Sequence, residues 1–202
     1  MDNTVIVLVI VIVVLVLALI AVGVMLYQRR RSEQLQERYG SEYERSVSEA
    51  GNRRAGEAEL TQREKRHRDL DIRDLRSEER DRFANTWAGI QREFVDDPQR
   101  AVHDADVLVV EIMRTRGYPV DDFERRAEDI SVAHPDVVQR YREANAVRDA
   151  TESGAADTEQ QRSAVTSYRS LIDALLTGDH STGGHSTGDH TTGNPTSKER
   201  TR

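Results

Sequence analysis

The chain has 202 residues, of which 29 are Lys or Arg and 36 are Asp or Glu, and it contains no cysteine. This length allows one or at most two domains, and the missing cysteine excludes disulfides, thiolate metal sites and thiol catalysis. The formal net charge of -7 argues against broad nucleic-acid binding, which needs a positive surface facing the phosphates, so no nucleic-acid partner is expected.

The apolar residues are concentrated in one N-terminal segment, residues 5–26, which begins with Val5 and ends with Leu26. In this segment 18 of 22 residues are Val, Ile or Leu, and none is charged. At the rise of an α-helix, 22 residues span about 33 Å, which is enough to cross a bilayer core. No Lys or Arg precedes the segment and no small-residue cleavage site follows it, which disfavours a cleaved signal peptide. We predict a transmembrane anchor that contacts the lipid bilayer along this segment.

Three arginines, Arg29, Arg30 and Arg31, directly follow the apolar segment and complete an anchor region of residues 1–31. Positively charged flanks remain on the cytoplasmic side of a membrane. We therefore expect a single-pass protein of the cell membrane, with its N-terminus outside and its C-terminal domain in the cytoplasm; the opposite orientation is the alternative. The same arginines can contact anionic head groups at about 1 kcal/mol each, although a topology signal alone explains them.

Residues 32–76 are rich in helix formers and in charges of both signs, which predicts a charged helical stalk. Three acid-before-base pairs at a spacing of four support an exposed helix: Glu49 with Arg53, Glu59 with Arg63, and Glu64 with Arg68. The apolar positions are sparse and hold no heptad, which disfavours a long coiled coil. One continuous helix would reach about 65 Å from the membrane; helical pieces that fold back on the next domain are the alternative.

Two further features of the stalk concern its shape and its surface. Gly40, Gly51 and Gly56 are expected to loosen the helix where they occur. Residues 63–68 are mostly charged, but Glu64 partly offsets the basic residues. We interpret this run as a solvated helix face rather than a nucleic-acid site.

Residues 77–177 have the pattern of a compact helical bundle. Ser77 is the candidate N-cap of its first helix. That helix carries a stripe at the spacing of one buried face: Phe83, Trp87, Ile90 and Phe94. Asp97 and Pro98 are expected as the N-cap and first residue of the second helix, and Gly117 as its end. Residues 107–113 are apolar nearly all round, so this second helix is expected at the centre of the bundle.

Two prolines, Pro119 and Pro135, divide the next part of the bundle. We expect a short third helix to open at Tyr118 and Pro119, with Phe123 on its apolar side, and a fourth helix to follow His134 and Pro135. His134 is expected to help form the turn rather than to bind a ligand.

A polar linker at residues 152–156 precedes the last helix. Asp157 and Gln160 form a capping box for that helix, and Gly178 ends it. No period-2 strand of useful length is present. The predicted fold class is all-α: an N-terminal transmembrane helix, a charged helical stalk, a four- to five-helix bundle and a disordered C-terminal tail.

The second bundle helix carries the best candidates for chemistry, which are His103, Asp104, Asp106 and Glu111. Such a group could in principle hold a divalent metal and activate water. However, His103 and Asp104 diverge by about 100° on one helix. We therefore expect Asp104 and Asp106 on a polar face in contact with water, and we assign no catalytic, cofactor-binding or metal-binding residue.

Further carboxylates are explained by helix ends, where they cap amides and meet the positive end of the dipole: Asp96, Asp97, Asp121, Asp122 and Asp129. No Gly-rich phosphate loop, Walker motif, Ser nucleophile elbow or HExxH is present. These absences favour a role other than catalysis, and no cofactor is expected.

The tail, residues 178–202, repeats a His/Ser/Thr/Gly motif in which His180, His185 and His190 are five residues apart. Because it lacks large apolar residues it cannot form a core, so we expect it to be disordered. Weak, adventitious metal binding by the three imidazoles is the alternative.

Several motifs resemble those of a family of uncharacterised single-pass membrane proteins of actinobacteria. The resembling segments are RYGSEYER (38–45), DIRDL (71–75), FVDDP (94–98), RGYP (116–119), ISVAHP (130–135) and YRSL (168–171). The resemblance implies membrane anchorage and carries no activity, and the tail repeat lies outside it.

The sequence thus favours a membrane-anchored helical interaction or scaffold module that offers its cytosolic bundle to a protein partner. The alternative is a metal-dependent enzyme or metal sensor that uses His103, Asp104, Asp106 and Glu111.

Overall fold

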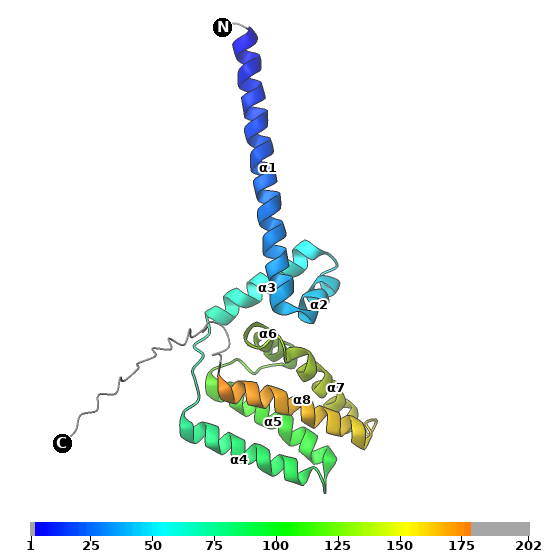
Figure 1. Ribbon diagram of the computed structural model, residues 1–202. Helices are drawn as coiled ribbons and strands as arrows, with labels where there is room; N and C mark the ends of the chain where they lie inside the picture. The colour runs from blue at the N-terminus through cyan, green and yellow to red at the C-terminus, as the bar shows by residue number, and fades with distance from the viewer. Residues whose placement is uncertain (1–2, 179–202) are drawn as a thin grey trace, which may run out of the picture.

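The computed structural model describes residues 3–178, and the side chains of residues 12–178. Within this range the chain forms eight α-helices and no strand (Figure 1). They are α1 (Asn3–Tyr39), α2 (Ser41–Glu49), α3 (Arg53–Arg68), α4 (Ser77–Glu93), α5 (Pro98–Arg116), α6 (Phe123–Ala133), α7 (Val138–Glu152) and α8 (Thr158–Thr177). The all-α class is therefore confirmed for the described part of the chain. Of the predicted disordered tail, residues 178–202, only Gly178 belongs to the described residues, and its three histidines lie outside them.

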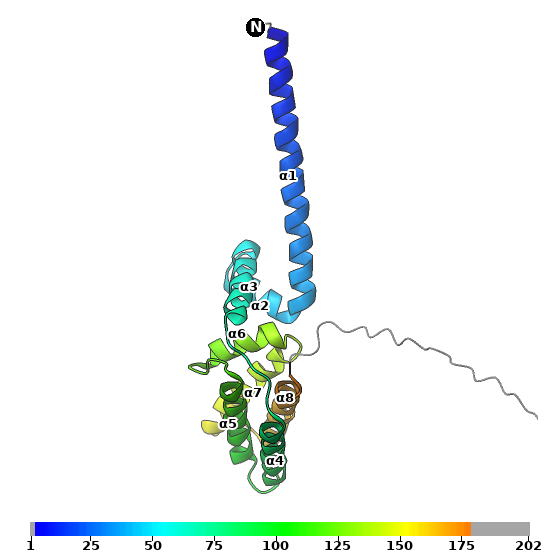
Figure 2. The same cartoon turned by 90° about the vertical axis from the view of Figure 1, so that its left-hand side faces the viewer.

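Helix α1 is a single helix of 37 residues that stands out from the remaining helices (Figures 1 and 2). Its stretch Ile12–Tyr39 contains a window of mean hydropathy 2.3, none of which is buried. Among residues 3–178 it is the one helix long and apolar enough to cross a membrane. The helix continues past the three arginines to Tyr39, where Gly40 takes a positive φ of 50° and turns the chain into α2.

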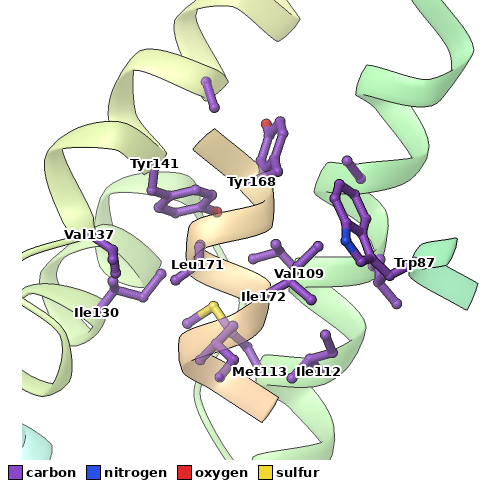
Figure 3. Packing of buried hydrophobic residues seen from close by; sticks show 14 of the residues in the cluster. Trp87, Val109, Ile112, Met113, Ile130, Val137, Tyr141, Tyr168, Leu171 and Ile172 are labelled. Carbon is purple, nitrogen blue, oxygen red and sulfur yellow. The ribbon is translucent and has the colours of Figure 1, made fainter. Parts of the chain in front are cut away.

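The core of the bundle lies where α5 and α8 pack together, with α4 against one side and α7 against the other (Figure 3). The predicted stripe of α4 is confirmed at Phe83, Trp87 and Ile90, which are buried. Phe94 is partly buried against the same core, as is Phe123 of α6. Helix α5 is central, as predicted, since it contacts α4, α7 and α8. Each large apolar side chain buried here stabilises the fold by about 1.5–3 kcal/mol.

Helix ends of the bundle follow the capping signals in several places. The carboxylate of Asp97 accepts a hydrogen bond from Arg100 N at 3.0 Å, and Pro98 is the first residue of α5. Asp157 and Gln160 form the expected capping box, with both hydrogen bonds at 2.8 Å. Gly178 is the C-cap of α8. These three predictions are confirmed.

Other boundaries differ from the prediction. Ser77 is the first residue of α4 rather than its N-cap, because Arg76 takes the cap position and its N–H donates to Glu79 at 2.9 Å. Helix α6 does not open at Tyr118. It begins at Phe123, since Asp122 accepts from Arg125 N at 2.8 Å and supplies a better cap.

The fourth bundle helix, α7, follows His134 as predicted. His134 is the C-cap of α6, and its carbonyl accepts from Val137 N at 3.1 Å, which confirms its part in the turn. Helix α7 includes Glu152, so the linker begins one residue later than predicted, at Ser153.

The predicted stalk is not one straight helix. The end of α1, α2 and α3 fold back on one another and form a second apolar cluster of Leu35, Tyr39, Tyr43, Leu60 and Val132, with Val47 packed against it. Val132 belongs to α6, so this cluster also joins the α2–α3 hairpin (residues 41–68) to the bundle. Of the two alternatives left open by the sequence, the structure has helical pieces that fold back on the next domain.

The three stalk glycines have defined places in this arrangement. Gly40 and Gly51 occupy the two turns with positive φ. Gly56 lies inside α3, where a Cβ would come within 2.8 Å of Val47 Cα. The prediction that Gly56 loosens a helix is therefore wrong: it allows α2 and α3 to pack closely.

The same folding changes the predicted ion pairs of the stalk. Glu59 and Arg63 are paired, as predicted. The Gly51 turn separates Glu49 from Arg53, so Glu49 pairs with Arg45 at 2.7 Å. Glu64, which lies in α3 together with Arg68, pairs instead with Arg38 of α1 at 3.0 Å.

The connection between α3 and α4 runs along the C-terminal end of α5. Arg73 N donates to the carbonyl of Arg116 at 2.9 Å, and the buried Arg116 guanidinium donates to the Leu175 carbonyl of α8 at 3.3 Å. Gly117, with a φ of 98°, ends α5 as predicted. A Cβ at Gly117 would lie 2.5 Å from the carbonyl oxygen of Asp71, so this close approach requires glycine.

Candidate functional site

A buried carboxylate lies where the α2–α3 hairpin meets the bundle. Glu42, the second residue of α2, is 1% exposed. Its Oε1 accepts hydrogen bonds from Arg63 Nη1 of α3 at 2.9 Å and from Arg142 Nη2 of α7 at 3.0 Å. Both arginine side chains are also buried. One carboxylate therefore bridges two cations from two parts of the chain, and we call these three residues the junction triad.

Peripheral carboxylates surround the triad and come from α3 and α6. Arg142 Nη1 also donates to Glu124 at 2.6 Å, and Arg63 donates to Glu59. Glu128 of α6 lies 3.7 Å from Arg63 Nη2 and 2.5 Å from Arg66 Nη2. The network thus ties α2, α3, α6 and α7 together by charge-assisted hydrogen bonds.

The arginines of the triad remain charged despite their burial. Desolvation opposes ionisation of Arg63, but hydrogen bonding to Glu59 and the charges of Glu128, Glu59 and Glu42 raise its pKa above the ordinary value. Desolvation likewise opposes ionisation of Arg142, and its hydrogen bonds to Glu124 and Glu42 raise its pKa. The junction is therefore held by full charges in a poorly hydrated setting, where the loss of one partner is costly.

Arg63 was expected on a solvated helix face, and that prediction is wrong for this residue. Its side chain is 4% exposed because α3 packs with this face against α2 and α6. Nothing in the local sequence links Glu42 with Arg142, which is 100 residues away. A usable signal was periodicity, because Arg63 follows the buried Gly56 and Leu60 at helical spacing.

A second buried carboxylate, Asp106, lies within the bundle. Asp106 is 5% exposed and accepts from Tyr168 Oη of α8 and from Arg148 Nη1 of α7, each at 3.3 Å. Burial is the main cause that raises the pKa of Tyr168, and the Asp106 charge adds to it. Burial likewise raises the pKa of Tyr141 to about 12. The prediction that Asp106 contacts water is wrong: it links the three central helices.

The other residues of the proposed metal group point elsewhere. His103 is largely exposed and its Nδ1 lies 3.8 Å from Glu152 of α7. Asp104 pairs with Arg100 at 3.4 Å, and Glu111 pairs with Arg82 of α4 at 3.3 Å. Within the described residues no group of three or more His, Asp or Glu side chains is arranged to hold a metal ion. The four candidates are therefore not brought together.

Asp129 is also placed differently from the prediction. It lies in the middle of α6 rather than at a helix end, and its side chain is 2% exposed. Burial raises its pKa, although Arg125 Nε lies 3.4 Å away and opposes the shift. By contrast, Asp97 and Asp122 are N-caps as predicted.

A hollow of about 330 Å³ opens between the start of α5 and the end of α7, and His103, Arg148 and Glu152 contribute to its lining. Both the α4–α5 connection and the α7–α8 turn lie at the end of the bundle far from α1 (Figures 1 and 2). The lining is mostly polar and charged, and it includes Gln99 on the exposed side.

Replacement of Asp106 should destabilise the protein more than replacement of its exposed neighbour Asp104. We expect Asp106→Asn to lower the free energy of unfolding by about 2–3 kcal/mol, because hydrogen bonds to a buried charge are lost. Asp104→Asn, the matched control, removes an exposed pair with Arg100 and should cost about 0.5 kcal/mol or less. Urea unfolding followed by Trp87 fluorescence measures both values. Equal effects of the two variants would contradict the buried role of Asp106.

Comparison with known proteins gives no relative: no family model, curated protein or solved structure matches the chain. The resemblance to actinobacterial single-pass membrane proteins therefore stays a prediction.

Proposed function

We propose that the protein is a single-pass membrane-anchored interaction module whose helical bundle is held in a fixed position beside its anchor helix. The observation that carries the proposal is the junction triad. Glu42 bridges Arg63 of the hairpin and Arg142 of the bundle, while Arg38 at the end of α1 pairs with Glu64 of α3 at 3.0 Å. A flexible tether would need neither contact.

In the proposed orientation the N-terminus is outside and the bundle is cytoplasmic. The support is the cluster Arg29, Arg30 and Arg31 at the end of the apolar part of α1, since such clusters remain in the cytoplasm. The hollow between α5 and α7 would then face the cytosol at the end of the bundle far from α1, where we propose that a protein partner binds.

The natural absence of cysteine allows a direct test of anchorage and orientation. Ser153 is exposed in the α7–α8 turn and is replaced by cysteine in the full-length protein. We expect the protein to stay in membranes after alkaline carbonate extraction, and a membrane-impermeant maleimide to label it only after cell lysis. Release by carbonate would refute the anchor. Labelling in intact cells would refute the orientation.

A photo-crosslinking residue at Gln99 tests the proposed partner surface in intact membranes. Gln99 is exposed at the hollow, and Ser163, exposed on α8, serves as the control position. We expect a discrete adduct of defined mass from position 99 and none from position 163. Equal adducts from both positions, or none from position 99, would contradict binding at the hollow.

The metal-dependent alternative has no geometric support among the described residues, because His103, Asp106 and Glu111 have separate partners in Glu152, Arg148 and Arg82.

A further inference from the structure

A wide groove lies between α1 and the start of α3, with a volume of about 860 Å³. Its lining includes four arginines, Arg29 and Arg31 from α1 and Arg53 and Arg54 from α3, together with a single acidic residue, Glu57. We call it the arginine groove. The imbalance of charge distinguishes it from the rest of a chain whose net charge is -7.

Hydrogen bonds fix the start of α3 beside α1 at the level of the groove. Arg31 Nη2 donates to Thr61 Oγ1 at 2.9 Å, and Arg53 Nε donates to Ser32 Oγ at 2.8 Å. Ser32 in turn donates to Glu57. These bonds bring arginines 22 or more positions apart in the sequence to one surface, and Figure 2 shows the start of α3 beside the lower part of α1.

The groove lies at the boundary between the apolar and the charged parts of α1. Met25, in the last turn of the apolar segment, lines one end, and Arg29 follows it one helical turn later. The side chain of Met25 is exposed, as are the apolar side chains of residues 12–24. If α1 crosses a bilayer, this boundary lies at the level of the phospholipid head groups.

Two of the four arginines are available to an anion. Arg53 pairs with Glu57 at 2.9 Å, and Arg31 is bonded to Thr61. Arg29 and Arg54 are exposed and form no ion pair with any residue of the described range 12–178. The N-terminal end of α3, with its positive dipole, lies in the same place and favours negative charge.

We propose that the arginine groove binds the head-group phosphate of an anionic phospholipid, with Arg29 and Arg54 as the phosphate ligands and the acyl chains along α1 beside Met25. This inference rests on the proposed membrane anchorage. Arginine suits the role because its planar guanidinium binds phosphate oxygens through two parallel hydrogen bonds. The bound lipid would fix the rotation of α1 relative to the membrane and, through α3, the position of the junction triad.

The test uses full-length protein in detergent micelles and native mass spectrometry to count bound lipid. The probes are phosphatidylglycerol, phosphatidylcholine and inorganic phosphate. The variant is the double substitution Arg29→Gln and Arg54→Gln, and the matched control is Arg162→Gln with Arg169→Gln, both exposed on α8. Each arginine near an anionic head group is worth about fivefold in affinity, so the double variant should bind phosphatidylglycerol about 25-fold more weakly.

We expect wild type and the α8 control to bind phosphatidylglycerol in preference to phosphatidylcholine, and the groove variant to lose that preference. Unchanged preference in the groove variant would overturn the proposal. Inorganic phosphate that displaces phosphatidylglycerol at equal concentration would also overturn it, because the site would then serve a soluble anion. Carbonate extraction separates the two proposals: a protein that stays in membranes but shows no lipid preference keeps its anchor and loses only the groove.

Discussion

Replacement of Glu42 by glutamine should detach the α2–α3 hairpin from the bundle. The amide keeps the volume of the side chain but leaves Arg63 and Arg142 without their shared counter-charge in a buried place. Breaking a buried ion pair in this way costs about 3–5 kcal/mol. We expect about 3 kcal/mol, because Arg142 retains Glu124 and Arg63 retains Glu59. Hydrogen exchange of the full-length protein in detergent should show the loss of protection first in α2 and α3.

Glu44→Gln is the matched control for this experiment. Glu44 lies two residues further along α2 and is exposed. Its replacement should change the free energy of unfolding by no more than about 0.5 kcal/mol. If Glu42→Gln left the protection of α2 and α3 unchanged, the triad would not hold the hairpin to the bundle.

Replacement of Gly117 by alanine should destabilise the protein strongly. Gly117 has a φ of 98°, and an added Cβ would lie 2.5 Å from the Asp71 carbonyl oxygen. Backbone strain at such a residue costs about 1–3 kcal/mol, and overpacking against a fixed neighbour costs about 1–3 kcal/mol more. We expect a loss of about 3 kcal/mol or more, together with displacement of the α3–α4 connection from the end of α5.

Gly89→Ala should change the stability of the protein in the opposite direction. Gly89 lies within α4, and a Cβ there would meet no atom within 4 Å. Alanine is a better helix former, so the variant should be more stable by up to about 1 kcal/mol. Thermal unfolding of both variants by circular dichroism makes the comparison. A Gly117→Ala protein as stable as wild type would show that the connection is not held against α5.

Local patterns allowed much of the bundle to be predicted from the sequence. The caps at Asp97 and Asp157 and the stop at Gly117 depend on residues within one helical turn. The stripe that contains Trp87 is a property of one helix. Such features need no knowledge of the neighbours, which is why they were recognised.

The polar residues of the interior were missed because their partners come from distant parts of the chain. Asp106 lies among Val102, Ala105 and Val109, at the spacing of a buried face of α5. Its position on this face, rather than its polar side chain, determines that it is buried. Arg142 follows buried Val138 and Tyr141 of α7 in the same way. Helical position could have indicated that both are buried, but the identity of the partner depends on how the helices pack.

The sequence left open whether the stalk folds back, and for a related reason it did not favour the hairpin over an extended helix. Leu35, Tyr43 and Leu60 are too widely spaced to form an apolar stripe on one helix, and they meet only after two turns have brought three helices together. A charged segment with few apolar residues therefore resembles an extended stalk until the tertiary contacts are known.

The distance between α1 and the bundle tests the central claim most directly. Spin labels on cysteines that replace Gln36 of α1 and Ser163 of α8, both exposed, report this distance by pulsed electron paramagnetic resonance in lipid nanodiscs. A bundle fixed beside its anchor predicts one narrow distance distribution, which broadens when Glu42 is replaced by glutamine. A broad distribution in the otherwise unchanged protein would show that the bundle moves freely on its anchor and would contradict the account.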